Sequence, residues 1–69
     1  METEIYESDP FTEKKQNLLA RFTSDYRFQK GDELYIHQGS HTLKVRLIDV
    51  RVHIQDGGAL TRELLALKL

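Results

Sequence analysis

The sequence predicts an α+β fold, in which one N-terminal helix packs on a small antiparallel sheet or bent-strand barrel that ends in a long C-terminal β-hairpin. Three observations lead to this class. Residues 43–69 hold most of the aliphatic side chains, alternate with period 2 and contain the pair Gly57-Gly58, as expected for two strands joined by a turn. Apolar residues between 10 and 22 recur at helical spacing. The 69 residues are enough for one domain.

Size and composition indicate a marginal core. A domain of this length buries only about 60% of the surface that its unfolded chain exposes. The sequence has no cysteine, so disulfides and thiolate metal sites are excluded. Because small domains usually need reinforcement, we expect a homo-oligomer, most simply a dimer.

Charge and hydropathy exclude two classes of function. The net charge of −1 argues against a general nucleic-acid or membrane binder, which would carry a basic excess. No apolar run approaches the roughly 18 residues that a membrane span requires. The acidic start differs from a secretory leader, so the cytoplasm is the expected location, and the small size favours a bacterial or phage source.

Residues 1–9 are expected to form an acidic flexible tail. They carry four acidic side chains and only Ile5 and Tyr6 to bury, a composition typical of a solvated terminus. The alternative is a short segment that docks through Ile5 and Tyr6 or adds a strand to a sheet edge.

A helix is predicted over about 10–22. Asp9 can cap the free amides of its first turn, and Pro10 is tolerated in the first helical position. Phe11, Leu18, Leu19 and Phe22 then form one apolar stripe.

Four strands are predicted after this helix, with the helix and strands together making a single domain over 10–69. Apolar and polar residues alternate in each strand, and turns rich in glycine separate them. The strands cover about 26–29, 33–38, 42–55 and 59–68. A helical alternative for 59–69 remains open, because this segment is rich in good helix formers.

The last two strands can be paired in register. A three-residue turn with glycine in the left-handed position places Ile54 opposite Leu60 and Arg51 opposite Glu63. Continued without interruption, this register gives the pairs Val50–Leu64, Ile48–Ala66, Leu47–Leu67 and Val45–Leu69.

The alternation changes phase at Leu47-Ile48, and two explanations remain open. A bulge or bend could re-aim the strand, as at a barrel corner. Otherwise the hairpin presents two apolar patches on opposite faces, one of which covers the domain's own core and the other a second copy of the chain.

The function expected from these patterns is a non-enzymatic protein-interaction or regulatory accessory module that self-associates through its C-terminal hairpin. Neither a catalytic motif nor a phosphate-binding loop is present, and no cofactor or metal is expected. His37 and His41 flank a turn, but two ligands do not make a zinc site. The candidate partner-binding residues are Val45, Leu47, Val50, Val52, Leu65 and Leu67.

A small nucleic-acid-binding barrel is the alternative function. Such barrels stack bases on aromatic side chains above a basic groove. The residues that could do so here are Lys44, Arg46, Arg51, Arg62, Tyr26 and Tyr35.

The expected order of elements is similar to that of small SH3-like and Sm-like barrels. The segment Asp9-Pro10-Phe11 also resembles the helix start of bacterial Sm-like proteins. Their RNA-binding signature of glycine, asparagine and aspartate has no counterpart between Leu34 and Leu60. The resemblance therefore implies a shape only, and no functional residue is carried over.

Overall fold

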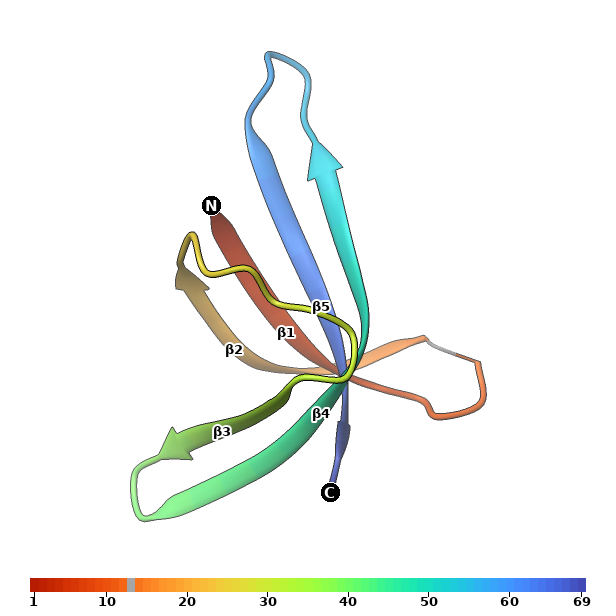
Figure 1. Cartoon of the computed structure of the whole chain (residues 1–69), viewed down its shortest axis with the longest axis vertical. Coiled ribbons are helices and arrows are strands. Elements are labelled where there is room, and N and C mark those ends of the chain that lie inside the picture. Colours follow the sequence, from red (N-terminus) through yellow and green to blue (C-terminus); the bar gives the residue numbers. More distant parts are fainter. Residues whose placement is uncertain (13) are drawn as a thin grey trace.

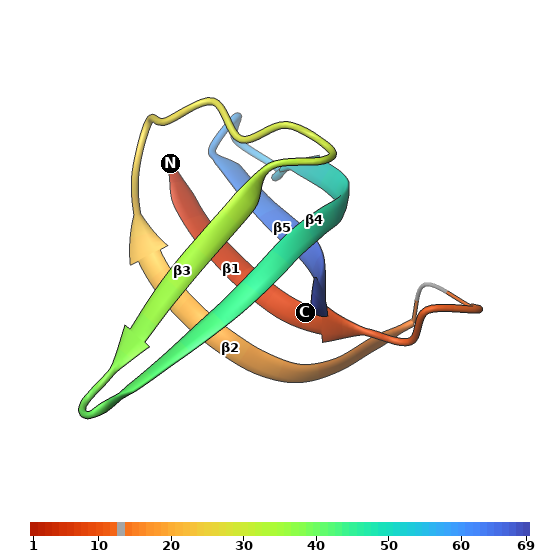
Figure 2. The ribbon, with the colours of Figure 1, turned by 60° about the horizontal axis from the view of Figure 1, so that its bottom comes forward.

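The structure is a computed structural model that describes residues 1–12 and 14–69. Its regular elements are the strands β1 (Glu2–Ser8), β2 (Lys15–Thr23), β3 (Glu33–Gln38), β4 (His41–Ile54) and β5 (Leu60–Lys68). They form one sheet in the order β2-β1-β5-β4-β3, which curls into a half-barrel (Figure 1, Figure 2). No helix occurs in the described residues, so the predicted α+β class is wrong and the fold is all-β.

The N-terminal segment is a strand inside the sheet, which corrects the expected flexible tail. β1 pairs antiparallel with β2 on one side and parallel with β5 on the other. Thr3 and Ile5 are buried, while Glu4 binds Arg21 across the opposite face at 2.5 Å. The acidic side chains are therefore the solvated face of a strand, and the segment lies between two neighbours and not at an edge.

The predicted helix over 10–22 is also wrong, because its second half is β2. The Asp9 carboxylate does cap free amides, accepting bonds from Phe11 and Thr12 at 2.8 and 3.0 Å, but the chain then turns back along β1. Phe11 is 92% exposed. Pairing with β1 overrides the helical spacing of the apolar residues, because tertiary partners outweigh the weak local propensity.

Residues 24–32 form a loop, so the predicted strand over about 26–29 is absent. The loop joins β2 to β3 and passes over one end of the curled sheet (Figure 2). Its closing residues continue the pairing with β4, since Gly31 donates to the carbonyl of Leu47 at 2.8 Å and Leu47 donates to the carbonyl of Asp32 at 2.9 Å.

The three C-terminal strands are confirmed. β3 has the predicted bounds, and 59–68 is a strand and not a helix. The hairpin register is confirmed in its outer half, where Ile54 faces Leu60 and Arg51 faces Glu63. In its inner half the register differs by one residue, giving the pairs Leu47–Ala66 and Val45–Lys68.

A bulge at Ile48 produces this shift and explains the change of phase. The register is interrupted between Leu47 and Asp49, so the residues on both sides of the bulge reach the same concave face. The buried core on that face consists of Ile5, Val45, Leu47, Leu64 and Ala66, with Val50 packed against it. A bulge that bends the strand, and not a straight hairpin with apolar patches on opposite faces, therefore explains the change of phase. Leu65 faces the other way and is also fully buried within the single chain.

The sheet does not close by main-chain pairing. β2 and β3 are its two edges, and the Gln38 side chain donates a bond to the carbonyl of Leu19 at 3.2 Å across the gap between them. The positions of β2 and β3 at the open side can be followed in Figure 1 and Figure 2.

Candidate interaction surface

The outer end of the β4–β5 hairpin projects beyond the rest of the protein (Figure 1). We call residues 52–60 the arm. Val52, Ile54 and Leu60 are 53%, 77% and 44% exposed. Val52 and Ile54 share a face by period 2, and Leu60 lies directly opposite Ile54. One face of the arm is therefore apolar and uncovered in the single chain.

The outer edge of the arm is also free. β3 pairs with β4 from His41 to Arg46, and the loop extends the pairing only to Leu47. Gln55 donates to Ala59 within the hairpin at 2.8 Å. Because bonding alternates along an antiparallel pair, the amides of Val52 and Ile54 point away from β5. No strand lies beside the outer end of β4 on that side (Figure 1). Val52 and Ile54 have no main-chain partner there in the described residues.

Arg62 anchors the base of the arm. It lies opposite Val52 and is 6% exposed. Its guanidinium donates to the hydroxyl of Thr3 at 2.7 Å and to the carbonyls of Tyr26 and Ser24 at 2.6 and 2.9 Å. These bonds fix the 24–32 loop to the sheet and satisfy a charge that would otherwise be costly to bury.

Two aromatic rings extend the surface at this base. The guanidinium of Arg62 lies 4.9 Å from the centre of the Phe28 ring, and the Tyr26 ring packs edge-on against Phe28 at 4.8 Å. Tyr26 is exposed. The contact of Arg62 with Phe28 and of Phe28 with Tyr26 thus connects the uncovered apolar face of the arm to the exposed ring of Tyr26.

The opposite face of the hairpin, at the base of the arm, is polar and internally paired. The Glu63 carboxylate binds the Lys15 ammonium and lies 2.5 Å from Nε2 of His53. The hydrogen bond from Lys15, helped by the contact with His53, holds the pKa of Glu63 below its usual value against the opposing effect of burial. The same bond raises the pKa of Lys15. This face is a network of neutralised charges and presents no excess of either sign.

Most of the predicted partner-binding residues are inside the protein. Val45, Leu47 and Leu65 are fully or almost fully buried, Val50 packs on the core and Leu67 is half-buried. Only Val52 is exposed. The other five belong to the inner half of the hairpin, where Val45, Leu47 and Val50 lie in or against the core.

The sequence analysis missed Ile54 and Leu60 as surface residues. Their pairing was predicted, but they were not among the candidate partner-binding residues. The available signal was their position at the outer end of a hairpin longer than any other strand pair, where a small core cannot reach.

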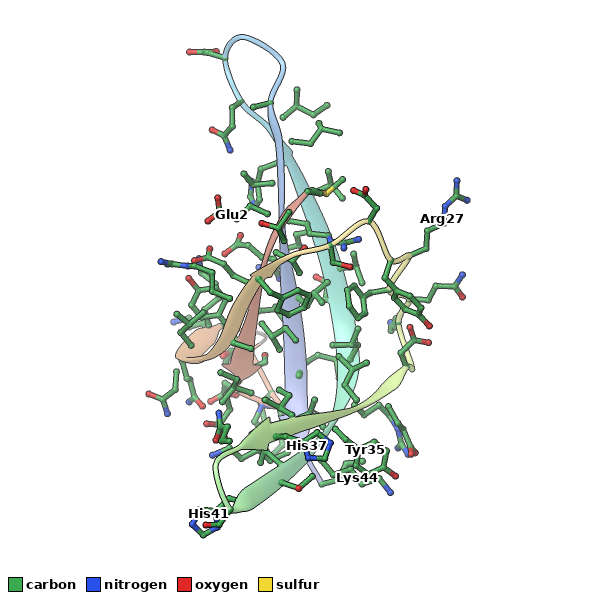
Figure 3. All side chains as sticks on the ribbon, turned by 90° about the vertical axis from the view of Figure 1, so that its left-hand side faces the viewer. Glu2, Arg27, Tyr35, His37, His41 and Lys44 are labelled. Atoms are coloured by element: carbon green, nitrogen blue, oxygen red, sulfur yellow. The ribbon has the colours of Figure 1, made fainter. Side chains whose placement is uncertain are left out.

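Most of the basic residues predicted for nucleic-acid binding form ion pairs with carboxylates of the same chain. Lys44 and Arg46 bind Glu33 at 3.5 and 2.6 Å, and these two cations hold the pKa of Glu33 low, the hydrogen bond from Arg46 having the largest effect. Arg51 binds Asp49 at 2.8 Å. The ring of Tyr35 is exposed beside Lys44, its cross-strand partner in the middle of the β3–β4 ladder (Figure 3).

Tyr26 and Arg62, the last two of this predicted set, lie at the base of the arm. Arg62 is buried under the loop, and Tyr26 packs on Phe28. The six residues therefore belong to separate parts of the molecule and do not form one basic groove.

The described residues contain no group of side chains with the geometry of a metal site, and no pocket is found among them. His37 bonds Thr42 through Nδ1 at 3.1 Å, and His41 lies at the hairpin tip (Figure 3). No helix in the described part of the chain is long and apolar enough to cross a membrane.

Comparison with protein-family models, with curated proteins and with solved structures finds no match to this chain.

Proposed function

We propose that the protein is a non-enzymatic protein-interaction or accessory module that self-associates through the outer end of its C-terminal hairpin. The observation that carries this proposal is the uncovered apolar face of the arm, formed by Val52, Ile54 and Leu60. Apolar side chains gathered on a projecting element mark interaction sites more often than scattered ones do.

The rest of the surface supports the same class. Ion pairs between strands occupy the convex face. Arg21–Glu4 joins the neighbouring strands β2 and β1, and Lys15–Glu63 joins β2 to β5 across β1. Nucleic-acid binding is not carried forward as a second candidate, because Lys44 and Arg46 share Glu33 and Arg62 is buried. A cytoplasmic location, in a bacterial or phage setting, remains part of the proposal.

Site-specific photo-crosslinking tests the function. A benzophenone amino acid at position 54 is expected to form adducts with protein, either a copy of this chain or a different protein from the native host. The same group at Ser40, in the β3–β4 turn, is the matched control. The proposal fails if position 54 gives no more adduct than position 40, or if the protein binds single-stranded RNA or DNA at micromolar concentration with steep salt dependence.

A further inference from the structure

The two halves of the outer edge of β4 differ in how they are protected. The inner half ends in the bulge at Ile48, and the amide of Val50 donates to the Asp49 carboxylate at 3.0 Å. Bulges and charged side chains are the usual devices that stop a strand edge from pairing with another chain. Beyond Val50 the one charged side chain before the tip is Arg51, which binds Asp49 at 2.8 Å. Val52, His53 and Ile54 include no proline, lysine or bulge, so this part of the edge is unprotected.

This unprotected edge is complementary to itself. An antiparallel pair centred on Val52 places Val52 opposite Val52 of a second copy and Val50 opposite Ile54. Residues directly opposite in such a pair share a face, so the apolar side chains of both copies meet on one face. The central residues have their amides and carbonyls turned outward, as a hydrogen-bonded pair requires.

The polar face tolerates the same register. It brings Arg51 opposite His53 of the second copy, and each of these residues already lies beside a carboxylate, Asp49 or Glu63. A pair centred on Arg51 would instead oppose two arginines, which is unfavourable. The register centred on Val52 is therefore favoured by both faces.

The shape of the molecule allows this pairing. The arm extends past β1, β2 and the 24–32 loop (Figure 1). In an antiparallel arrangement about a two-fold axis, the two bodies lie at opposite ends of the paired arms. The paired residues 50–54 lie short of Leu47, where the 24–32 loop occupies the edge of β4.

We propose that the arm binds a second copy of this chain by strand pairing through Val52 and Ile54, making one continuous sheet from two half-barrels. The proposal rests on the proposed function and names its partner and its geometry. The Val50 amide stays on Asp49, so about four main-chain bonds form between the copies. A contact this short lies below the usual interface size, and we expect a dissociation constant on the order of 10–100 µM.

Disulfide trapping tests the register, because the chain has no cysteine of its own. Directly opposed residues in a hydrogen-bonded pair have Cα atoms about 5.5 Å apart, within the range that a disulfide spans. Under mild oxidation at micromolar concentration, Val52→Cys is expected to give a covalent dimer. Ser40→Cys, at a position that is also exposed but lies on the other hairpin, is the control. Equal trapping at both positions would reveal random collision and overturn the proposal.

Sedimentation analysis of two substitutions tests the role of the strand edge. Val52→Pro removes an amide that points away from β5 and so leaves the hairpin's own bonds in place. It is expected to remain folded and to weaken dimerisation at least tenfold. Val52→Thr keeps the amide and the branched shape and should dimerise nearly as the parent does. A folded Val52→Pro variant that dimerises like the parent overturns strand pairing.

The failure of this inference is distinguishable from the failure of the proposed function. If the purified parent stays monomeric at 200 µM and Val52→Cys is not trapped, the second copy is excluded as the occupant. Adducts from position 54 to a different host protein would then uphold the interaction module alone. If position 54 forms no adduct with any protein, both proposals fail.

Discussion

Arg62 shows how one residue can be basic, buried and structural at once. It reaches three oxygen atoms of a strand and a loop and lies over the Phe28 ring. Arginine suits this position because its planar guanidinium carries several donors in a fixed arrangement. At the level of sequence, an arginine opposite Val52 looks like a solvated charge or a nucleic-acid contact, since the loop that it binds is distant along the chain.

Replacing Arg62 tests this role. Arg62→Met preserves apolar volume but leaves the carbonyls of Ser24 and Tyr26 without their donor, so the free energy of unfolding should fall by about 2–4 kcal/mol. The free energy of unfolding of Arg62→Lys should lie between those of the parent and Arg62→Met, because a lysine cannot reach all three acceptors. Arg27→Met, at an exposed position of the same loop, is the control and should change little. Urea denaturation measures the difference, and an Arg62→Met variant as stable as the parent would contradict the anchor.

Glu63 gives the protein a dependence on acid. Its pKa is lowered in the folded state, first by the hydrogen bond from Lys15. The stabilisation is therefore complete above the unfolded value of about 4.5 and is lost as the pH falls through the lower folded value. At pH 7 the free energy of unfolding of Glu63→Gln should be about 0.5–1 kcal/mol lower than that of the parent. Between about pH 5 and pH 3 it should fall by less than the free energy of unfolding of the parent does. Thermal melts across this range measure it, and parallel curves for parent and variant would contradict the assignment.

The bulge is the decisive feature among the elements. Without Ile48, residues 47, 49 and 50 would alternate regularly and keep their observed partners Ala66, Leu65 and Leu64. Deleting Ile48 should therefore preserve the register and the core, at a cost of about 1–2 kcal/mol for the lost curvature and contacts.

Deleting Arg46 is the matched control for that deletion. It removes a residue from the regular part of the same strand, and a one-residue slip turns every following side chain to the other face. This variant should not fold. Circular dichroism and thermal melts compare the two deletions, and equal damage by both would show that Ile48 is not an extra residue in the ladder.

The elements that could be predicted are those whose signal is local. The outer hairpin register follows from alternation, a glycine turn and the pairing of Arg51 with Glu63, all within residues 43–69. The exact pairing of the inner half of the hairpin could not be predicted. A bulge at Ile48 and a straight strand with two apolar faces both fit the same alternation of residues. The segment of β2 was predicted as a helix because Leu18, Leu19 and Phe22 fit one helical stripe, whereas the adjacent Leu18 and Leu19 cannot share a face at the period of a strand.

For the candidate site, the residues predicted from the sequence lie mainly in the inner half of the hairpin, whereas the uncovered apolar face lies in its outer half. The apolar density of Val45 and Leu47 is highest where the core is, and only the three-dimensional cover distinguishes core from surface. Of the six predicted partner-binding residues, Val52 alone is exposed. Ile54 and Leu60 are exposed because the half-barrel does not extend to the outer end of the hairpin.

At the scale of the whole molecule, the fold depends on joining its two ends. β1 and β5 come from opposite ends of the chain and pair in parallel, and the 24–32 loop and Gln38 bridge the remaining gap. Such non-local pairing has no signature in the sequence of either strand, which is why residues 1–9 looked like a tail. It also predicts slow folding compared with a helical protein of equal length.

Truncation tests the central place of β1. A chain that starts at Asp9 loses the buried Thr3, Ile5 and Ser8 and also β1, the strand with which β2 pairs in the sheet. Two of the five strands are then lost to the sheet, and the remaining three have too small an apolar face for a stable core. We expect no cooperative thermal transition. Removing only the exposed Leu69 is the control and should leave a cooperative transition. If the chain without residues 1–8 melts cooperatively near the temperature of the parent, β1 is dispensable and the N-terminal segment is the flexible tail that its composition indicates.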